Sequence, residues 1–223
     1  MRACVLIPTY NESSTIKNLI GKVRMQGLNA VVIDDGSLDN TSEIARQSGA
    51  IVLESGKNEG KGASLKKGFN FALEEGYDAV ITMDGDGQHR PEDIPFFLRL
   101  AGTSGTAIFV GNRMSKTRNM PLLRLFTNRF MSWLVSLIAK QKIPDSQCGF
   151  RLIKKEVLKK LSLRTSKYET ESEMLIKASR AGFKIESVPI KTVYSGEKSS
   201  IHPVIDSCRF FKFIIRELWI TKS

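Results

Sequence analysis

The sequence is poor in cysteine and histidine and has no long apolar run. Its three cysteines, Cys4, Cys148 and Cys208, lie far apart and form no CxxC pair. Neither a disulfide framework nor a cysteine zinc site is therefore expected, and a reducing compartment is favoured. The two histidines, His89 and His202, accompany no nucleophile elbow, which argues against Ser-His-Asp catalysis. No stretch reaches the ~18 apolar residues that span a bilayer, and the short apolar N-terminal run indicates a strand and not a signal peptide.

Positive charge, in contrast, is abundant. The chain has 34 lysines and arginines against 23 acidic residues, a formal net charge of +11 and a sequence pI near 9.7. This balance favours anionic partners such as nucleotides, nucleic acid or an anionic membrane face. The basic residues are spread along the chain and form no stripe with interleaved aromatics, so a nucleic-acid partner is not expected.

The length of 223 residues and the hydrophobic content of 41% suit one well-buried domain. In the first half, short apolar runs alternate with helical patterns, which is typical of an α/β domain with a mainly parallel central sheet. The predicted strands are 3–7, 30–33, 50–53, 79–83 and 106–110. The predicted helices between them are 12–26, 41–48, 61–75 and 92–100.

Two long amphipathic helices are predicted in the second half, over 121–139 and 203–221. Each gathers its polar residues on one side and is otherwise strongly apolar. The polar positions are Arg124, Asn128, Ser132, Ser136 and Lys140 in the first helix and Asp206, Arg209, Lys212 and Arg216 in the second. The pattern alone favours helices packed in a core. The alternative is a pair of interfacial helices that rest on a membrane.

Paired carboxylates follow the fourth predicted strand, in the segment Asp84-Gly85-Asp86-Gly87-Gln88. The carboxyl ends of strands are where open α/β sheets bind ligands. Two close carboxylates repel each other unless a cation or a proton lies between them, and hard oxygen ligands of this kind suit Mg²⁺ or Mn²⁺ with a phosphate. We therefore expect Asp84, Asp86 and Gln88 to surround a metal ion and a phosphorylated substrate.

Several further motifs complete a pattern. The segments 8–12 (PTYNE), 32–39 (VIDDGSLD), 57–63 (KNEGKGA) and 83–89 (MDGDGQH) each lie beside a predicted strand end or helix start. In this order they resemble the family 2 glycosyltransferases of GT-A type, which use nucleotide-diphosphate sugars. The later motifs 111–114 (GNRM), 145–152 (DSQCGFRL) and 194–199 (YSGEKS) are similar to those of the dolichyl- or polyprenyl-phosphate sugar transferases. The resemblance extends to about residue 215 and implies a Rossmann-like three-layer domain.

The resemblance also implies roles at the donor site. Tyr10 would stack on the base, Glu12 would meet the base or ribose, and Pro8 would shape the turn. Asp35 would bind the edge of uracil or guanine or the ribose, with Ile33 alongside.

Around the diphosphate, the resemblance implies that Asp86 is the most direct metal ligand. Gly85 stands where relatives often have Ala, and it leaves room for a backbone contact with the sugar nucleotide. The structural alternative for this segment is a tight Asp-Gly turn between strand and helix.

The acceptor would be held by cations, because a polyprenyl phosphate is already anionic and needs placement more than deprotonation. The family-matching positions are Arg113, Arg151 and Lys198, with Arg124 or Arg129 as further candidates. Asp145 would orient the acceptor site or its arginines, which makes Asp86, Arg113 and Asp145 the expected catalytic set. Glu171 and Glu173, in a helix predicted over 168–181, are either surface charges or active-site neighbours.

Together these features predict an inverting transfer of a hexose from GDP-mannose or UDP-glucose to a polyprenyl phosphate. Residues 1–115 would bind the nucleotide sugar, and 116–223 would form the acceptor and membrane-proximal half of one domain. We expect a peripheral protein at the cytosolic membrane face, held there directly or by an anchoring partner protein. One alternative is transfer to a hydroxyl of a lipid-linked glycan or cell-wall polymer, with Asp145 as base. The other is a non-catalytic nucleotide-sugar-binding membrane scaffold.

Overall fold

The computed structural model describes the chain apart from residues 115–119, 121, 192–202 and 221–223. Its central sheet has the strand order β3-β2-β1-β4-β6-β5-β7. The strands are β1 (Ala3–Thr9), β2 (Asn29–Asp34), β3 (Ile51–Glu54), β4 (Ala79–Thr82), β5 (Ile108–Asn112), β6 (Arg151–Lys154) and β7 (Ile185–Pro189). Neighbouring strands are parallel, except that β6 runs antiparallel to both β4 and β5. The sheet is therefore mainly parallel, as the sequence predicts.

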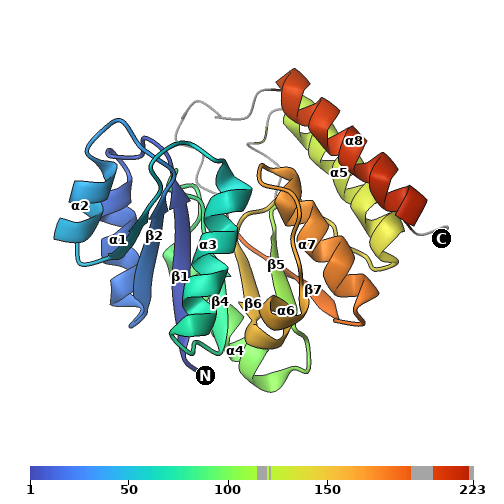
Figure 1. Ribbon diagram of the computed structural model, residues 1–223. Coiled ribbons are helices and arrows are strands. Elements are labelled where there is room, and N and C mark those ends of the chain that lie inside the picture. The colour runs from blue at the N-terminus through green and yellow to red at the C-terminus, as the bar shows by residue number, and fades with distance from the viewer. Residues whose placement is uncertain (115–119, 121, 192–202, 221–223) are drawn as a thin grey trace.

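Helices cover both faces of the sheet and form three layers with it. They are α1 (Ile16–Met25), α2 (Thr41–Gln47), α3 (Lys61–Glu74), α4 (Ile94–Thr103), α5 (Leu122–Ala139), α6 (Lys155–Lys160), α7 (Glu169–Arg180) and α8 (Pro203–Ile220), with a 3-10 turn η1 (Pro91–Asp93) before α4. Figure 1 shows α3, α6 and α7 in front of the sheet and α1 behind it. The long helices α5 and α8 lie side by side against α7, beyond the edge of the sheet.

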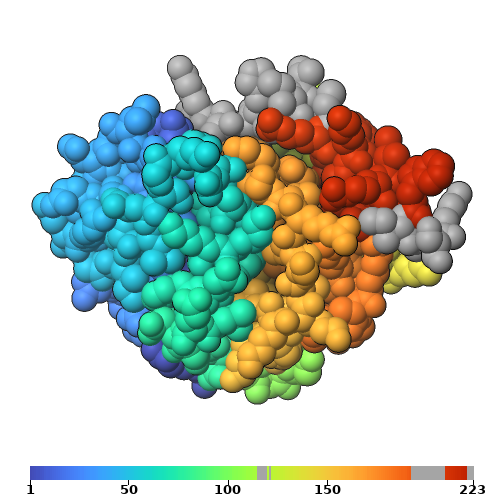
Figure 2. Space-filling view, in the orientation of Figure 1, coloured from blue at the N-terminus to red at the C-terminus, as the bar shows by residue number. Residues whose placement is uncertain are grey.

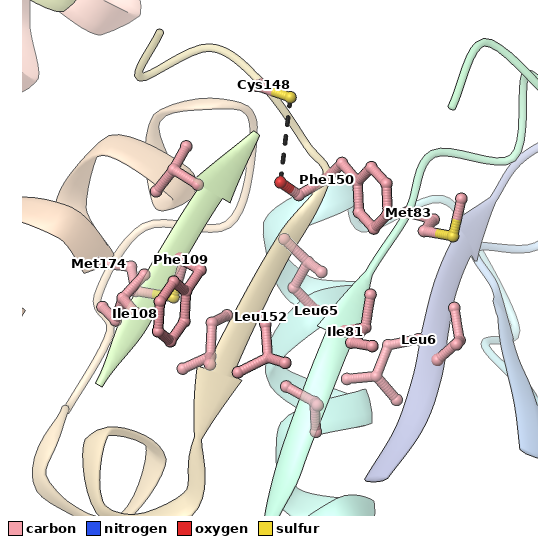
Figure 3. Close-up of a cluster of buried hydrophobic side chains, with 14 of the residues drawn as sticks. Leu6, Leu65, Ile81, Met83, Ile108, Phe109, Cys148, Phe150, Leu152 and Met174 are labelled. Atoms are coloured by element: carbon pink, nitrogen blue, oxygen red, sulfur yellow. Dashed lines mark hydrogen bonds between the residues drawn. The ribbon is translucent and has the colours of Figure 1, made fainter. Parts of the chain in front are cut away.

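The core follows the middle of the sheet. Leu6 of β1, Ile81 of β4 and Leu152 of β6 are fully buried, and Figure 3 shows their side chains next to one another across three strands. The ring of Phe150 stacks on Phe97 of α4, with the two ring centroids 4.6 Å apart. Each such buried side chain contributes about 1.5–3 kcal/mol. The strand ends that carry the polar loops therefore rest on a rigid base.

The five predicted strands and the helices of the first half are present, with boundaries that differ by a few residues. Three elements, β6, α6 and β7, were not predicted. β6 has only the apolar pair Leu152-Ile153 between Arg151 and Lys154, and β7 contains Glu186 and ends in a proline. Both strands are stabilised by neighbours distant in sequence, because β6 pairs with β4 and β5, and β7 with β5.

The orientation of α5 agrees only in part with the core-packed interpretation, because Val135, Ile138 and Ala139 are buried in the core but the rest of its apolar side is not. Its polar stripe points inward: Asn128 and Ser132 are buried, and the Ser132 hydroxyl accepts a hydrogen bond from the backbone N–H of Ser146 at 2.9 Å. Ser136 accepts one from the N–H of Ile143 at 3.0 Å. Most of the large apolar side chains of α5 lie on the surface instead, among them Trp133, which is 58% exposed. The hydroxyls face inward because they bind the backbone of the loop 143–146.

The helix α8 continues this exposed apolar surface. Phe210, Phe213 and Ile214 are buried, whereas Phe211 and Trp219 are exposed, and Figure 2 shows α8 on the outside of the molecule. We call the exposed apolar side chains of both helices the α5/α8 face. Its members are Leu122, Leu123, Phe126, Phe130, Trp133, Leu137, Phe211, Ile215, Leu218 and Trp219. Within the described residues, no helix has the length and hydrophobicity needed to cross a bilayer.

A glycine in α3 permits the close approach of α7. A Cβ atom on Gly62 would lie 1.9 Å from the Thr170 hydroxyl oxygen and 2.7 Å from the Lys167 carbonyl oxygen. We predict that Gly62→Ala lowers the free energy of unfolding by about 1–3 kcal/mol, because backbone atoms cannot move aside cheaply. Urea denaturation measures the change.

The control is Gly21→Ala in α1, where a Cβ would meet no atom within 4 Å. That substitution should raise the free energy of unfolding by about 0.5–1 kcal/mol, the ordinary gain of alanine over glycine in a helix. Equal effects of the two substitutions would contradict the packing argument.

Candidate active site

The polar loops predicted to form the site meet at one edge of the sheet. β1 lies between β2 and β4 and is parallel to both, so the loops after these three strands are neighbours. Hydrogen bonds join them. Thr15 donates to the carbonyl oxygen of Gly85 at 2.7 Å, and the side-chain oxygen of Asn11 accepts from the N–H of Leu38 at 2.8 Å. Asn11 adopts a left-handed backbone, with φ of 58°, so this link also shapes the turn between Tyr10 and Glu12.

Asp84 lies in the loop after β4 and is paired with a lysine. The Lys61 ammonium lies 2.5 Å from Oδ1 of Asp84 and 3.0 Å from Oε2 of Glu171. Burial acts to raise the pKa of Asp84, but the charge of Lys61 outweighs it and the pKa lies well below its usual range. Burial acts to lower the pKa of Lys61, and the two carboxylates raise it overall. Both groups are therefore charged at neutral pH.

His89 fixes the backbone of the same loop. Its Nδ1 accepts a hydrogen bond from the N–H of Asp84 at 3.2 Å. Burial lowers the pKa of His89 from 6.5 to about 4, against the opposing effect of Asp84, so the imidazole is neutral at pH 7. The accepted hydrogen bond leaves its proton on Nε2, which lies 3.9 Å from Oδ2 of Asp84. His89 is thus a structural support of the loop and not a cation in the site.

Asp86 and Gln88 lie in the turn that follows. The Oδ1 atom of Asp86 accepts a hydrogen bond from the N–H of Gln88 at 3.0 Å, and both side chains are partly exposed. Among the described residues, no group of three or more His, Cys, Asp or Glu side chains is placed to hold a metal ion. Two carboxylates and an amide oxygen nevertheless suit Mg²⁺ or Mn²⁺, because these ions take one or two protein carboxylates together with substrate phosphates.

The predicted nucleotide residues divide into buried and accessible groups. Pro8 and Ile33 are buried partners within the β1–β2 ladder, and the place of Ile33 alongside the nucleotide stays a prediction. Asp35 is also buried, and its two carboxylate oxygens accept hydrogen bonds from the N–H groups of Glu59 and Gly60 at 2.8 and 2.7 Å. It holds the loop before α3. Tyr10, in contrast, is 41% exposed at the end of β1 and can offer its ring to a base.

Arg113 and Asp145 form a buried ion pair. The Nε and Nη2 atoms of Arg113 donate to the two carboxylate oxygens of Asp145, each at 2.8 Å, and the backbone N–H of Arg113 donates to the same carboxylate at 3.0 Å. The charge of Arg113 also acts, with larger effects of other groups, to lower the pKa of Asp84 and of His89. Asp145 therefore fixes the position of the Arg113 side chain, and its role in orienting an acceptor site stays a prediction.

The expectation that Arg151 binds an acceptor phosphate is not supported. Its side chain is fully buried, and its guanidinium donates to the carbonyl oxygens of Cys148, Glu171 and Ser146 at 2.8, 2.9 and 2.8 Å. Arg151 is a structural residue of β6. Of the other basic candidates, Arg124 is partly exposed at the start of α5, and Lys198 lies outside the described residues.

Glu171 and Glu173 are buried, so the surface-charge interpretation is wrong for both. Glu171 contacts Lys61, whereas Glu173 accepts hydrogen bonds from the N–H groups of Arg164 and Thr165 at 2.9 Å each. Only Glu171 belongs to the site. Sequence reasoning assigned no role to Lys61. The signal that marks it is its place between Gly60 and Gly62 at the start of a helix.

Curated relatives match most of the chain. A UDP-N-acetylglucosamine–dolichyl-phosphate N-acetylglucosaminyltransferase of Methanococcus voltae is 34% identical over 214 residues, which cover 86% of this chain and 85% of the relative. An undecaprenyl-phosphate mannosyltransferase of Micrococcus luteus is 30% identical over 210 residues, with 86% and 84% covered.

The fold also has a solved counterpart. Glucosyl-3-phosphoglycerate synthase from Mycobacterium tuberculosis, in complex with UDP, superposes with a TM-score of 0.79 at 20% identity, over 97% of this chain and 79% of that one. The predicted GT-A-type fold is confirmed. The family model described as "Glycosyl transferase family 2" matches residues 4–162, and the chain belongs to this family.

Proposed function

We propose that this glycosyltransferase moves a hexose or N-acetylhexosamine from a nucleotide-diphosphate sugar to a polyprenyl phosphate. The observation that carries the proposal is the arrangement of α5. Its outer side belongs to the apolar α5/α8 face, and its inner side binds the loop 143–146, whose Asp145 pairs with Arg113. One helix therefore contributes to an exposed apolar surface and also contacts the loop that carries the partner of a buried cation. The names of the two relatives above, which include lipid phosphates, support the same acceptor class.

The donor would lie at the carboxyl ends of β1, β2 and β4. Tyr10 would stack on the base and Glu12 would contact the base or ribose. Asp84, Asp86 and Gln88 would hold Mg²⁺ or Mn²⁺, which when bound neutralises charge on the diphosphate leaving group. Solved structures of the synthase from M. tuberculosis contain Mn²⁺ or Mg²⁺ together with UDP, which supports this assignment.

The reaction would be a single in-line displacement. An acceptor phosphate oxygen attacks the anomeric carbon, the bond from that carbon to the diphosphate oxygen breaks, and the nucleoside diphosphate leaves with the electron pair. Arg113, with Arg124 and Lys198 as further candidates, would place the acceptor phosphate. No general base is required, because the nucleophile is already an anion.

A hydroxyl acceptor is less consistent with the geometry. It would need Asp145 as base, but Asp145 is buried and both of its oxygens are engaged by Arg113. Turnover of UDP-N-acetylglucosamine, UDP-glucose and GDP-mannose with and without polyprenyl phosphate separates these cases. Transfer that occurs only with the lipid phosphate supports the proposal. An equal rate of nucleotide-sugar turnover with and without the lipid phosphate contradicts the proposed acceptor.

The α5/α8 face would seat the protein on an anionic membrane at the cytosolic side. Arg129, Lys140 and Lys212 are exposed on the same two helices or directly after α5, so cations accompany the aromatic and aliphatic side chains, as in interfacial helices. A partner protein as an additional anchor remains compatible with this arrangement.

We predict that Asp86→Asn abolishes most metal-dependent transfer while the protein stays folded. Loss of several kcal/mol of charge stabilisation at the diphosphate corresponds to roughly 100-fold or more in rate. Initial rates with saturating donor, before and after chelation by EDTA, measure this effect. The matched control is Asp78→Asn, which changes a partly exposed carboxylate, paired with Lys155, before the opposite end of β4 and should leave the rate unchanged. Full activity of Asp86→Asn would refute the metal assignment.

A second prediction concerns membrane attachment. The double variant Trp133→Ser/Trp219→Ser should bind phosphatidylglycerol-containing vesicles roughly a hundredfold more weakly than the wild type, as measured by flotation. Each indole contributes on the order of 1.5–3 kcal/mol when it leaves water. Because Trp133 and Trp219 are 58% and 74% exposed, their removal should not unfold the protein.

The control for this experiment is Met25→Ser/Leu38→Ser, which removes two apolar side chains that are 83% and 88% exposed elsewhere on the surface. That variant should float like the wild type. A wild-type protein that never floats, or equal losses in both variants, would argue against the α5/α8 face as a membrane site.

A further inference from the structure

A chain of alternating charges leads from β6 to the donor site. The Arg151 guanidinium lies 3.5 Å from Oε1 of Glu171, whose other oxygen lies 3.0 Å from the Lys61 ammonium. That ammonium in turn lies 2.5 Å from Oδ1 of Asp84. Four elements or loops that are distant in sequence therefore share one row of side chains, which ends at the first carboxylate of the expected metal site.

Lys61 is shared between two carboxylates, and this arrangement matters when a divalent cation arrives. A metal ion on Asp84 must displace the ammonium from that carboxylate. The side chain of Lys61 is only 18% exposed, and a buried charge that loses its partner is costly. Glu171 offers an alternative partner within reach, so Lys61 can release Asp84 and remain neutralised.

We propose that Glu171 is a positioning residue that retains the Lys61 ammonium when Asp84 takes up the metal ion of the donor complex. The inference rests on the proposed function, because it requires a divalent cation with a nucleoside diphosphate at Asp84. It assigns to Glu171 a role beyond packing. Without its carboxylate, Lys61 would have Asp84 as its one acidic partner in this row and would compete with the metal.

The experiment is a titration of Mn²⁺ into protein saturated with UDP, and in parallel with GDP, with free Mn²⁺ followed by electron paramagnetic resonance. We expect Glu171→Gln to raise the dissociation constant of Mn²⁺ about tenfold or more. In the Lys61→Met background, the same substitution should change it less than twofold, because Glu171 acts through Lys61. Such non-additivity is the signature of two directly coupled residues.

A general electrostatic effect of Glu171 on the metal would give the opposite pattern. Its removal would then weaken Mn²⁺ binding equally in both backgrounds, and that result overturns the proposal. Unchanged Mn²⁺ binding in Glu171→Gln also overturns it. Should Glu171→Gln not fold, Lys61→Met alone decides: the proposal requires Mn²⁺ binding as tight as in the wild type or tighter, and weaker binding overturns it.

Glu173→Gln provides the structural control. Glu173 is buried on the same helix and binds the backbone of residues 164–165, away from Lys61. Its substitution should lower the melting temperature and leave the Mn²⁺ dissociation constant unchanged. If the wild type fails to bind Mn²⁺ both in the presence of UDP and in the presence of GDP, the proposed function itself fails. If the wild type binds Mn²⁺ normally and Glu171→Gln binds it equally well, only the role of Glu171 fails.

Discussion

Compensation of buried or partly buried negative charge is the constraint on which the active-site edge depends. Asp35, Asp84 and Asp145 are all held near the carboxyl ends of the strands, where each needs a specific partner. Asp35 takes the N–H groups of the loop before α3, Asp84 takes Lys61, and Asp145 takes Arg113. These partners come from distant parts of the chain, so satisfying the carboxylates also fixes the positions of the loops.

The two halves of the chain meet through this charge compensation. Lys61 starts α3 in the first half, and Glu171 starts α7 in the second. Gly62 and Gly149 allow segments of the two halves to approach each other closely. A Cβ on Gly149, for example, would lie 2.5 Å from a carboxylate oxygen of Asp84. At Gly62 the helix α3 packs closely against residues 166–170, and at Gly149 the backbone packs against the carboxylate of Asp84.

The need to pair polar groups inside the protein also explains why the polar side of α5 faces inward. An amphipathic pattern does not say which face is buried, and the usual rule assigns the apolar face to the core. In α5 the hydroxyls of Ser132 and Ser136 satisfy the backbone N–H groups of Ser146 and Ile143. The apolar side is left on the surface, next to that of α8. An exposed apolar area of this kind is typical of an interaction site.

Much of the site could be predicted from residue types at strand ends. The loops of Tyr10, Asp35 and Asp86 follow strongly apolar runs, and parallel strands bring such loops to one edge. Arg151 could not be interpreted correctly in the same way. Its sequence neighbours are consistent with a phosphate ligand, and only the three carbonyl oxygens around its guanidinium reveal a structural role.

The sequence by itself determined the α/β architecture, the family and the place of the donor loops, because strand hydrophobicity and short polar motifs are local properties. Tertiary structure alone decided the antiparallel strand β6, the burial of Glu171 and Glu173, and the pairing of Lys61 with Asp84. It also decided which face of α5 meets solvent. Each of these depends on contacts between residues far apart in the chain, and no local pattern records which distant partner will neutralise a buried charge.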